Sequence, residues 1–224
     1  MTAVPHALTT LSRVKDYLSI SDTSLDTVID QLISRATDWF EQRTGRRFKE
    51  TTYTEELYDG GDRILFLNQY PVNSLTTFEF RVTTIGDPSP VFQAFLATDF
   101  ALYAKAGMIR FIFGGRRTIS GVVHDGTTPK DIQSIRVTYD AGFLIDFDNE
   151  NDPAQHTLPF DIEDFIIRLV ARRVNQKNAS GVASESVEGA SITWASPTGD
   201  QLSFDDKQII DRYTKKTITT QLAQ

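Results

Sequence analysis

The chain has 224 residues and carries 23 Lys and Arg against 30 Asp and Glu, a net charge of −7. This balance argues against a dedicated binder of duplex DNA, which normally uses a basic face, but it leaves DNA as a passing neighbour. The absence of Cys excludes disulfides and thiolate metal clusters, and no apolar run approaches the roughly 20 residues needed to cross a bilayer, so we expect a soluble, unsecreted protein.

Residues 11–18 and 25–44 are predicted to form helices, because apolar side chains recur there at spacings of three and four. Thr23 and Asp26 predict a capping box at the start of the longer helix. Gly45 suits the left-handed position that commonly ends a helix.

After residue 50 the apolar pattern changes to a period of two, which predicts strands. The turn sequence Asp59-Gly60-Gly61 separates residues 51–58 from 63–67, so we expect a hairpin there. Further strands are predicted at 75–82, 92–96, 99–103, 108–113, 118–123 and 135–140. Several short strands separated by turns indicate an antiparallel sandwich or small barrel.

A third helix is predicted to begin near Pro159 and Asp161. The Ser-, Gly- and Thr-rich stretch that follows has few large apolar groups and precedes a short amphipathic segment, residues 204–215. This tail is either a disordered terminus or an arm that orders on another subunit, and its large aromatic residues favour the arm. The candidate interface residues are Trp194, Phe204, Ile209, Ile210 and Tyr213.

The predicted fold class is α+β. A small bundle of three main helices holds an inserted antiparallel β-sandwich or barrel-like domain, and an extended C-terminal arm ends in a short helix. The expected domains are a helical core (1–50 and 157–178), the inserted β-rich domain (51–145), an acidic loop (146–156) and the C-terminal arm with its short helix (179–224).

No motif predicts catalysis, a metal or a cofactor. The sequence lacks phosphate-binding, dinucleotide-binding, zinc-protease and nucleophile-elbow motifs, and its three histidines lie far apart. The loop 146–152 has the alternating oxygens of an EF-hand, but Asn151 and Thr157 occupy the positions that require Gly and Glu. We interpret it as a solvated acidic loop.

A basic cluster follows the second helix and consists of Arg43, Arg46, Arg47 and Lys49. Cations are favourable near a helix C-terminus, so these residues are either helix-end charges or a surface for an anionic partner.

Several stretches of the chain match the pattern of one known family. They are residues 11–18, 25–48 with the ending Glu-x-x-Thr-Gly-Arg-x-Phe, Tyr53 to Pro71, Val137 to Phe143, the Pro159-led helix and Ser184 to Val187. In these stretches, about half of its length, the chain resembles the head-tail connector proteins, also called adaptor or head-completion proteins, of tailed bacteriophages and gene-transfer particles. The stretch 81–133 is longer than in small members of the family, so its role is not carried over.

The resemblance implies a structural protein without enzymatic activity, cofactor or membrane contact. It implies a homo-oligomeric ring, expected to be dodecameric, that docks on the portal and contacts tail or neck proteins of the stopper and terminator kinds. Genomic DNA would pass through the ring during packaging and ejection. The expected location is the virion neck, after assembly in the host cytoplasm.

The acidity of the chain is concentrated in residues 51–160, which hold 8 basic and 14 acidic side chains, a net charge of −6. Carboxylates that face a DNA channel would repel phosphates within a Debye length, roughly 8 to 10 Å. The candidate acids, which would face the channel or another, basic partner, are Asp125, Asp131, Asp146, Asp148, Glu150 and Asp152.

The alternative function is a virion-associated β-module that binds carbohydrate or another ligand. An aromatic-rich sandwich with acidic loops could bind sugar through Tyr58, Tyr70 or Tyr103.

Overall fold

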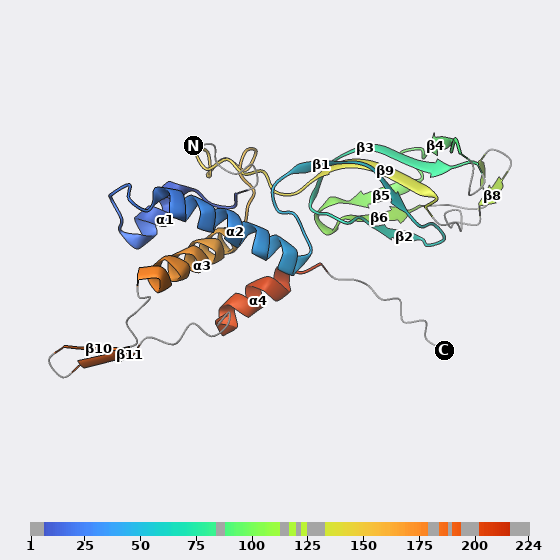
Figure 1. The fold of residues 1–224 in the computed structure, drawn as a ribbon. Helices are drawn as coiled ribbons and strands as arrows, with labels where there is room; N and C mark the ends of the chain where they lie inside the picture. Colours follow the sequence, from blue (N-terminus) through green and yellow to red (C-terminus); the bar gives the residue numbers. More distant parts are fainter. Residues whose placement is uncertain are drawn as a thin grey trace, which may run out of the picture. The chain divides into compact units, whose positions relative to one another are not determined.

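The computed structural model describes residues 7–83, 88–112, 117–119, 122–124, 133–178, 184–187, 190–193 and 202–215. The chain divides into two compact units, one formed by Met1–Phe48 with Leu144–Gln224 and the other by Lys49–Phe143. The first is built on helices and the second on antiparallel sheets, which confirms the predicted α+β class (Figure 1). The described strands form open sheets, so the second unit is sandwich-like and no closed barrel appears among them.

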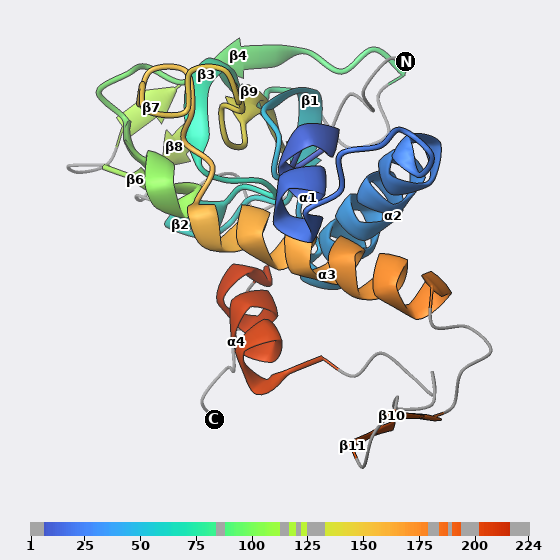
Figure 2. The same cartoon turned by 90° about the vertical axis from the view of Figure 1, so that its left-hand side faces the viewer.

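In the described part of the helical unit, four helices pack against one another (Figure 2). Their bounds are α1 (Leu11–Leu18), α2 (Asp26–Thr44), α3 (Phe160–Asn178) and α4 (Phe204–Tyr213). The ring of Phe40 in α2 lies 4.8 Å from that of Phe48 and 5.1 Å from that of Phe165 in α3. Aromatic rings at these distances anchor the contact between α2 and α3.

The C-terminal end of α2 agrees with the prediction, but its N-terminal end does not. Gly45 has the expected left-handed backbone, with φ at 68°. The predicted capping box of Thr23 and Asp26 is wrong, because the N-cap is Leu25 and no side chain caps the helix. The Asp26 carboxylate instead accepts a hydrogen bond from Lys15 Nζ at 2.7 Å. The Asp26 carboxylate therefore binds a cation of α1 and does not cap α2.

Two antiparallel sheets form the sandwich of the second unit. The larger has the strand order β1 (Thr51–Tyr58), β9 (Ile135–Ala141), β3 (Val72–Arg81) and β4 (Phe92–Ala94). The smaller has the order β2 (Ile64–Phe66), β6 (Met108–Phe111) and β5 (Phe100–Tyr103), with the 3-10 turn η1 (Ala104–Ala106) between β5 and β6. The other described strands pair as β7 (Arg117–Ile119) with β8 (Val122–His124), and β10 (Ser184–Val187) with β11 (Ala190–Thr193).

The hairpin predicted across Asp59-Gly60-Gly61 is wrong. β1 pairs with β9 and β2 pairs with β6, so the two strands that flank the turn lie in different sheets. The turn sequence carries the chain from one sheet to the other. Local composition predicts that the chain turns there, but it does not determine which strand pairs with the next.

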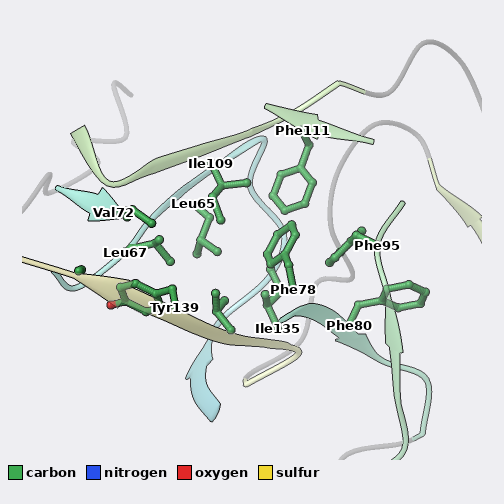
Figure 3. Close-up of a cluster of buried hydrophobic side chains, with 12 residues drawn as sticks. Leu65, Leu67, Val72, Phe78, Phe80, Phe95, Ile109, Phe111, Ile135 and Tyr139 are labelled. Carbon is green, nitrogen blue, oxygen red and sulfur yellow. The ribbon is translucent and has the colours of Figure 1, made fainter. Parts of the chain in front are cut away.

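The core of the sandwich lies between the inner faces of the two sheets (Figure 3). Burial alternates along β9, because successive side chains of a strand point to opposite faces. From the smaller sheet, Leu65, Ile109 and Phe111 face this core. The buried cluster consists of Leu65, Leu67, Val72, Phe78, Phe80, Phe95, Ile109, Phe111, Ile135, Val137, Tyr139 and Ala141.

A polar network joins β1 and β9 to the chain that leaves β2. The Glu56 carboxylate accepts hydrogen bonds from the Tyr58 hydroxyl, from the Tyr139 hydroxyl at 2.8 Å and from Asn68 Nδ2 at 3.3 Å. The backbone N–H groups of Asn68 and Gln69 donate to the two tyrosine hydroxyls at 3.0 and 3.3 Å. Burial above all raises the pKa of Tyr58 and Tyr139, so both hydroxyls stay protonated and donate to Glu56.

Replacing Glu56 by Ala is expected to destabilise the sandwich by about 2 kcal/mol, because the change leaves partly buried donors without their shared acceptor. The matched control is Glu55→Ala, whose side chain is 70% exposed and pairs with Arg136, and it should cost less than about 1 kcal/mol. Urea unfolding followed by the near-UV circular dichroism of tyrosine measures both losses. Equal losses in the two variants would contradict this role of Glu56.

Candidate functional site

The predicted interface residues of the C-terminal segment differ in their exposure. Trp194 lies outside the described residues, and Phe204, the first residue of α4, is 74% exposed. Ile209 and Ile210 are only 9% and 5% exposed, because α4 docks against α2 and α3 of its own unit (Figure 2). These two side chains hold α4 in place, which leaves Phe204 as the described apolar residue of α4 that a partner can reach.

One buried carboxylate anchors the N-terminal end of α4. Asp206 forms a capping box with Ser203, and its side chain is 1% exposed. Its Oδ2 accepts a hydrogen bond from Arg172 of α3 at 2.8 Å, and Arg168 lies 3.6 Å from Oδ1. Burial alone would raise the pKa of Asp206, but Arg172 and the Ser203 groups outweigh it and hold the pKa below its usual value.

A second anchor holds the C-terminal end of α4. Asp161, at the start of α3, accepts hydrogen bonds from the Tyr213 hydroxyl and from Arg212, both at 2.8 Å. Burial, with a smaller effect from Asp161, raises the pKa of Tyr213 to about 12. The Lys215 N–H then donates to the last carbonyl of α2, on Thr44, at 2.8 Å. The docked helix thus caps the end of α2.

The basic cluster divides by burial. Arg43 and Arg47 are exposed, whereas Arg46 is only 4% exposed. Its guanidinium lies over the Phe48 ring, 5.3 Å from Cζ to the centroid, and Nη1 donates to the last carbonyl of α4 at 3.4 Å. Arg46 therefore packs inside the helical unit. Lys49 belongs to the sandwich unit, so Arg43 and Arg47 are the members that an anionic partner of the helical unit can reach.

The acidic loop before α3 is ordered by its own hydrogen bonds. The Asp146 carboxylate accepts from Asn149 Nδ2 and from the Asp148 N–H, each at 3.0 Å. The Asp152 carboxylate accepts from the Ala154 N–H at 2.9 Å. These bonds hold the pKa of Asp146 and of Asp152 below the ordinary carboxyl value, so both stay charged at neutral pH.

Glu150, in the same loop, has a structural role through Arg13 of α1. Arg13 contacts Glu150 with Nη2 and Glu163 of α3 with Nη1, the latter at 2.8 Å, and its guanidinium lies 5.1 Å from the centroid of the Phe147 ring. Burial opposes the charge of Arg13, but the two carboxylates outweigh it and raise its pKa. Sequence patterns missed Arg13, because it lies 137 residues from Glu150.

The six acidic candidates therefore do not form one group. Asp125 and Asp131 lie outside the described residues. Glu150 is paired with Arg13, whereas Asp146, Asp148 and Asp152 lie at the surface of one loop.

No metal site is built from the described side chains, and the three candidate sugar contacts differ in their surroundings. No described group of His, Asp and Glu could hold a metal ion, and no described helix is long and apolar enough to cross a membrane. The Tyr58 hydroxyl, a candidate sugar contact, already binds Glu56 and Asn68. Tyr103 is 46% exposed on β5.

One family model matches nearly the whole chain. A family model described as head completion protein matches residues 7–213. No curated protein matches the chain. A chain solved in the neck of an empty GTA particle, computed with C6 symmetry, has a TM-score of 0.52 and 16% identity, covering 98% of this chain and 96% of that one.

Two further solved chains have the same coverage of 98% and 96%. One, from the neck of a native GTA particle computed with C12 symmetry, has a TM-score of 0.49 and 18% identity. The other, from the virion of a native gene transfer agent particle, has a TM-score of 0.48 and 17% identity. The neck chain of the empty particle therefore shares the fold of this chain over nearly its whole length.

Replacing Asp206 by Ala is expected to weaken the docking of α4 by about 2 kcal/mol, because Arg172 and Arg168 lose their buried partner. Hydrogen exchange of the amides of residues 204–213 measures the effect. The matched control is Asp205→Ala, because Asp205 is exposed in the same helical turn. Equal protection of α4 in the wild type and in Asp206→Ala would contradict this anchor.

The stabilisation by Asp206 is also expected to depend on pH. Its folded pKa lies below the ordinary value of 3.8, so the contribution is complete above about pH 4 and is lost as the pH falls through the lowered value. Thermal unfolding of the wild type and Asp206→Ala from pH 7 to pH 2 measures this difference. We expect the gap in Tm to close below pH 4, and a constant gap would show that Asp206 acts without its charge.

Proposed function

The chain belongs to the head completion protein family, and from this premise we propose that it forms a ring at the neck of a tailed phage or gene-transfer particle. The ring docks on the portal, contacts tail or neck proteins on its other side and lets the genome pass through its lumen. The role is structural and joins the head to the tail.

The family match is the observation that carries the proposal. It spans residues 7–213 and so includes both the helical unit and the inserted sandwich. The neck chain of the GTA particle, which was computed with C6 symmetry, supports it through the shared fold. A ring of more than two copies requires each copy to present two different surfaces, one for each neighbour, and such a contact closes into a ring when the rotation closes.

Within the helical unit, Phe204 is the residue that we propose for the contact with the portal or a neighbouring copy. Large aromatic side chains contribute much of the binding energy of protein interfaces when a partner covers them. Phe204 lies at the exposed start of α4, and the buried Asp206 two residues later fixes the backbone at that point. A contact at Phe204 is therefore held in a fixed position relative to α3, because Arg172 of α3 binds Asp206.

The acidic loop supports the proposed passage of DNA. Asp146 and Asp152 are held charged by their hydrogen bonds, and Asp148 is exposed between them. Facing a lumen, these charges would repel the phosphates over roughly a Debye length, so the genome slides without tight binding. Glu150 contributes less, because Arg13 neutralises it.

Mixing the purified chain with portal rings of the same particle type tests the proposal. Negative-stain images are expected to show an added ring on the portal, and a chain that stays monomeric without added density would contradict the function. The Phe204→Ser variant should bind the portal roughly 10-fold more weakly. The matched control is Phe160→Ser, because Phe160 is also the first residue of a helix and is 66% exposed.

A further inference from the structure

The outer face of the smaller sheet is apolar around one arginine. Successive side chains of a strand point to opposite faces of a sheet. Leu65 and Ile109 point into the core, so their neighbours along β2 and β6 point outward. We call this outer surface the Arg110 face, and it consists of Ile64, Phe66, Ala101, Tyr103, Met108 and Arg110. Ile64, Phe66 and Tyr103 are 40%, 43% and 46% exposed.

The register of the strands makes this face continuous. Phe66 and Tyr103 flank Met108 on its two sides in one row, and Ile64 and Ala101 flank Arg110 in the next. Side chains directly opposite each other in antiparallel strands touch, so the apolar groups form one surface. Arg110 is exposed and has no ion-pair partner among the described residues. A contiguous apolar surface around a single charge is typical of a protein interface.

The outer face of the larger sheet presents the opposite charge. We call it the Asp140 face, and it includes Thr52, Leu57, Ser74, Thr77, Arg136, Thr138 and Asp140, with Glu55 and Glu79 paired to Arg136. Asp140 accepts a hydrogen bond from the Thr52 hydroxyl at 2.6 Å on one carboxylate oxygen and from the Ser74 hydroxyl at 2.5 Å on the other. Thr52 lies in β1 and Ser74 in β3, on the two sides of β9.

These two hydroxyls fix the Asp140 carboxylate without neutralising it. They hold its pKa below the ordinary value, and no described cation pairs with it. Each carboxylate oxygen has a second lone pair, so both can still accept the two parallel N–H bonds of a guanidinium. The same face has an apolar member, because Leu57 is 42% exposed.

We propose that the Arg110 face of one copy packs against the Asp140 face of the next copy, with the Arg110 guanidinium bound to the Asp140 carboxylate. This inference rests on the proposed ring. The inner faces of the two sheets meet in the core, so their outer faces point away from each other and can each meet a different neighbour, as in a heterologous ring contact. A two-fold contact of two Arg110 faces is disfavoured, because it brings two arginines together in an apolar setting.

Charge reversal in alternate copies tests the pairing. Arg110→Asp alone places two carboxylates at every junction, and Asp140→Arg alone places two arginines there, so each is expected to lower ring yield on the portal at least about 10-fold. In an equimolar mixture, a ring that alternates the two variants restores an opposite-charge pair at every junction. We expect the mixture to recover ring yield to within about 3-fold of wild type.

The outcomes separate this inference from the proposed function. A mixture that assembles no better than either variant, while both variants keep the wild-type circular dichroism and the wild type forms rings, would overturn the pairing and leave the ring intact. Normal assembly of either single variant would overturn it as well. A wild-type chain that forms no ring on the portal would refute the proposed function, and the inference would fall with it.

Cysteine cross-linking gives a second measurement, because the chain has no native Cys. The Arg110→Cys, Asp140→Cys double variant should give a ladder of covalent oligomers after oxidation on the portal, whereas neither single variant should cross-link. Covalent dimers from Arg110→Cys alone would indicate a two-fold contact of Arg110 faces and overturn the proposal. Rings of the double variant that give no ladder would overturn it too.

Discussion

The antiparallel pairing of β1 with β9 is the constraint on which the architecture depends. These strands begin and end the sandwich along the chain, and Thr51 lies opposite Ala141. The Glu50 N–H donates to the Phe143 carbonyl at 3.0 Å, so the chain enters and leaves at adjacent backbone positions. Gly142 permits this approach, since its φ is 118° and a Cβ there would lie 2.8 Å from the Glu50 backbone. An insertion whose ends meet leaves the host fold intact, and α2 and α3 keep their shared aromatic core.

The elements that sequence predicted well are those set by local periodicity. The apolar stripe of α2, the left-handed Gly45 and the alternation along β9 follow from backbone geometry within a few residues. Contacts between residues far apart in the sequence could not be predicted in this way. Periodicity indicates which face of an element is buried, but it does not indicate which element covers that face. Thus β1 and β2 were expected in one hairpin, and the roles of Arg13 and of Asp206 were not expected. No local pattern of α1 indicates that Arg13 joins Glu150 and Glu163.

The acidity of the middle of the chain has several structural uses besides the proposed repulsion of DNA. Glu56 holds two tyrosines, Glu79 pairs with Arg136, and Glu150 pairs with Arg13. All three stabilise the fold, and the ion pairs of Glu79 and Glu150 leave little unbalanced charge at those two carboxylates. The acidic loop and Asp140 differ, because hydrogen bonds from neutral donors fix their carboxylates and leave the charge in place. The acidity behind the net charge of −7 therefore includes carboxylates that are paired within the fold and carboxylates that no described cation neutralises.

The family match supports a structural role for this chain at the head-tail junction, and the surfaces described above are the ones proposed to make its contacts there. Cryo-electron microscopy of the neck of the intact particle that contains this chain tests it most directly. The account predicts a ring of copies between portal and tail, with the helical unit and the sandwich of each copy resolved. A map in which the chain is absent from that junction, or is present there as a single copy, would contradict it.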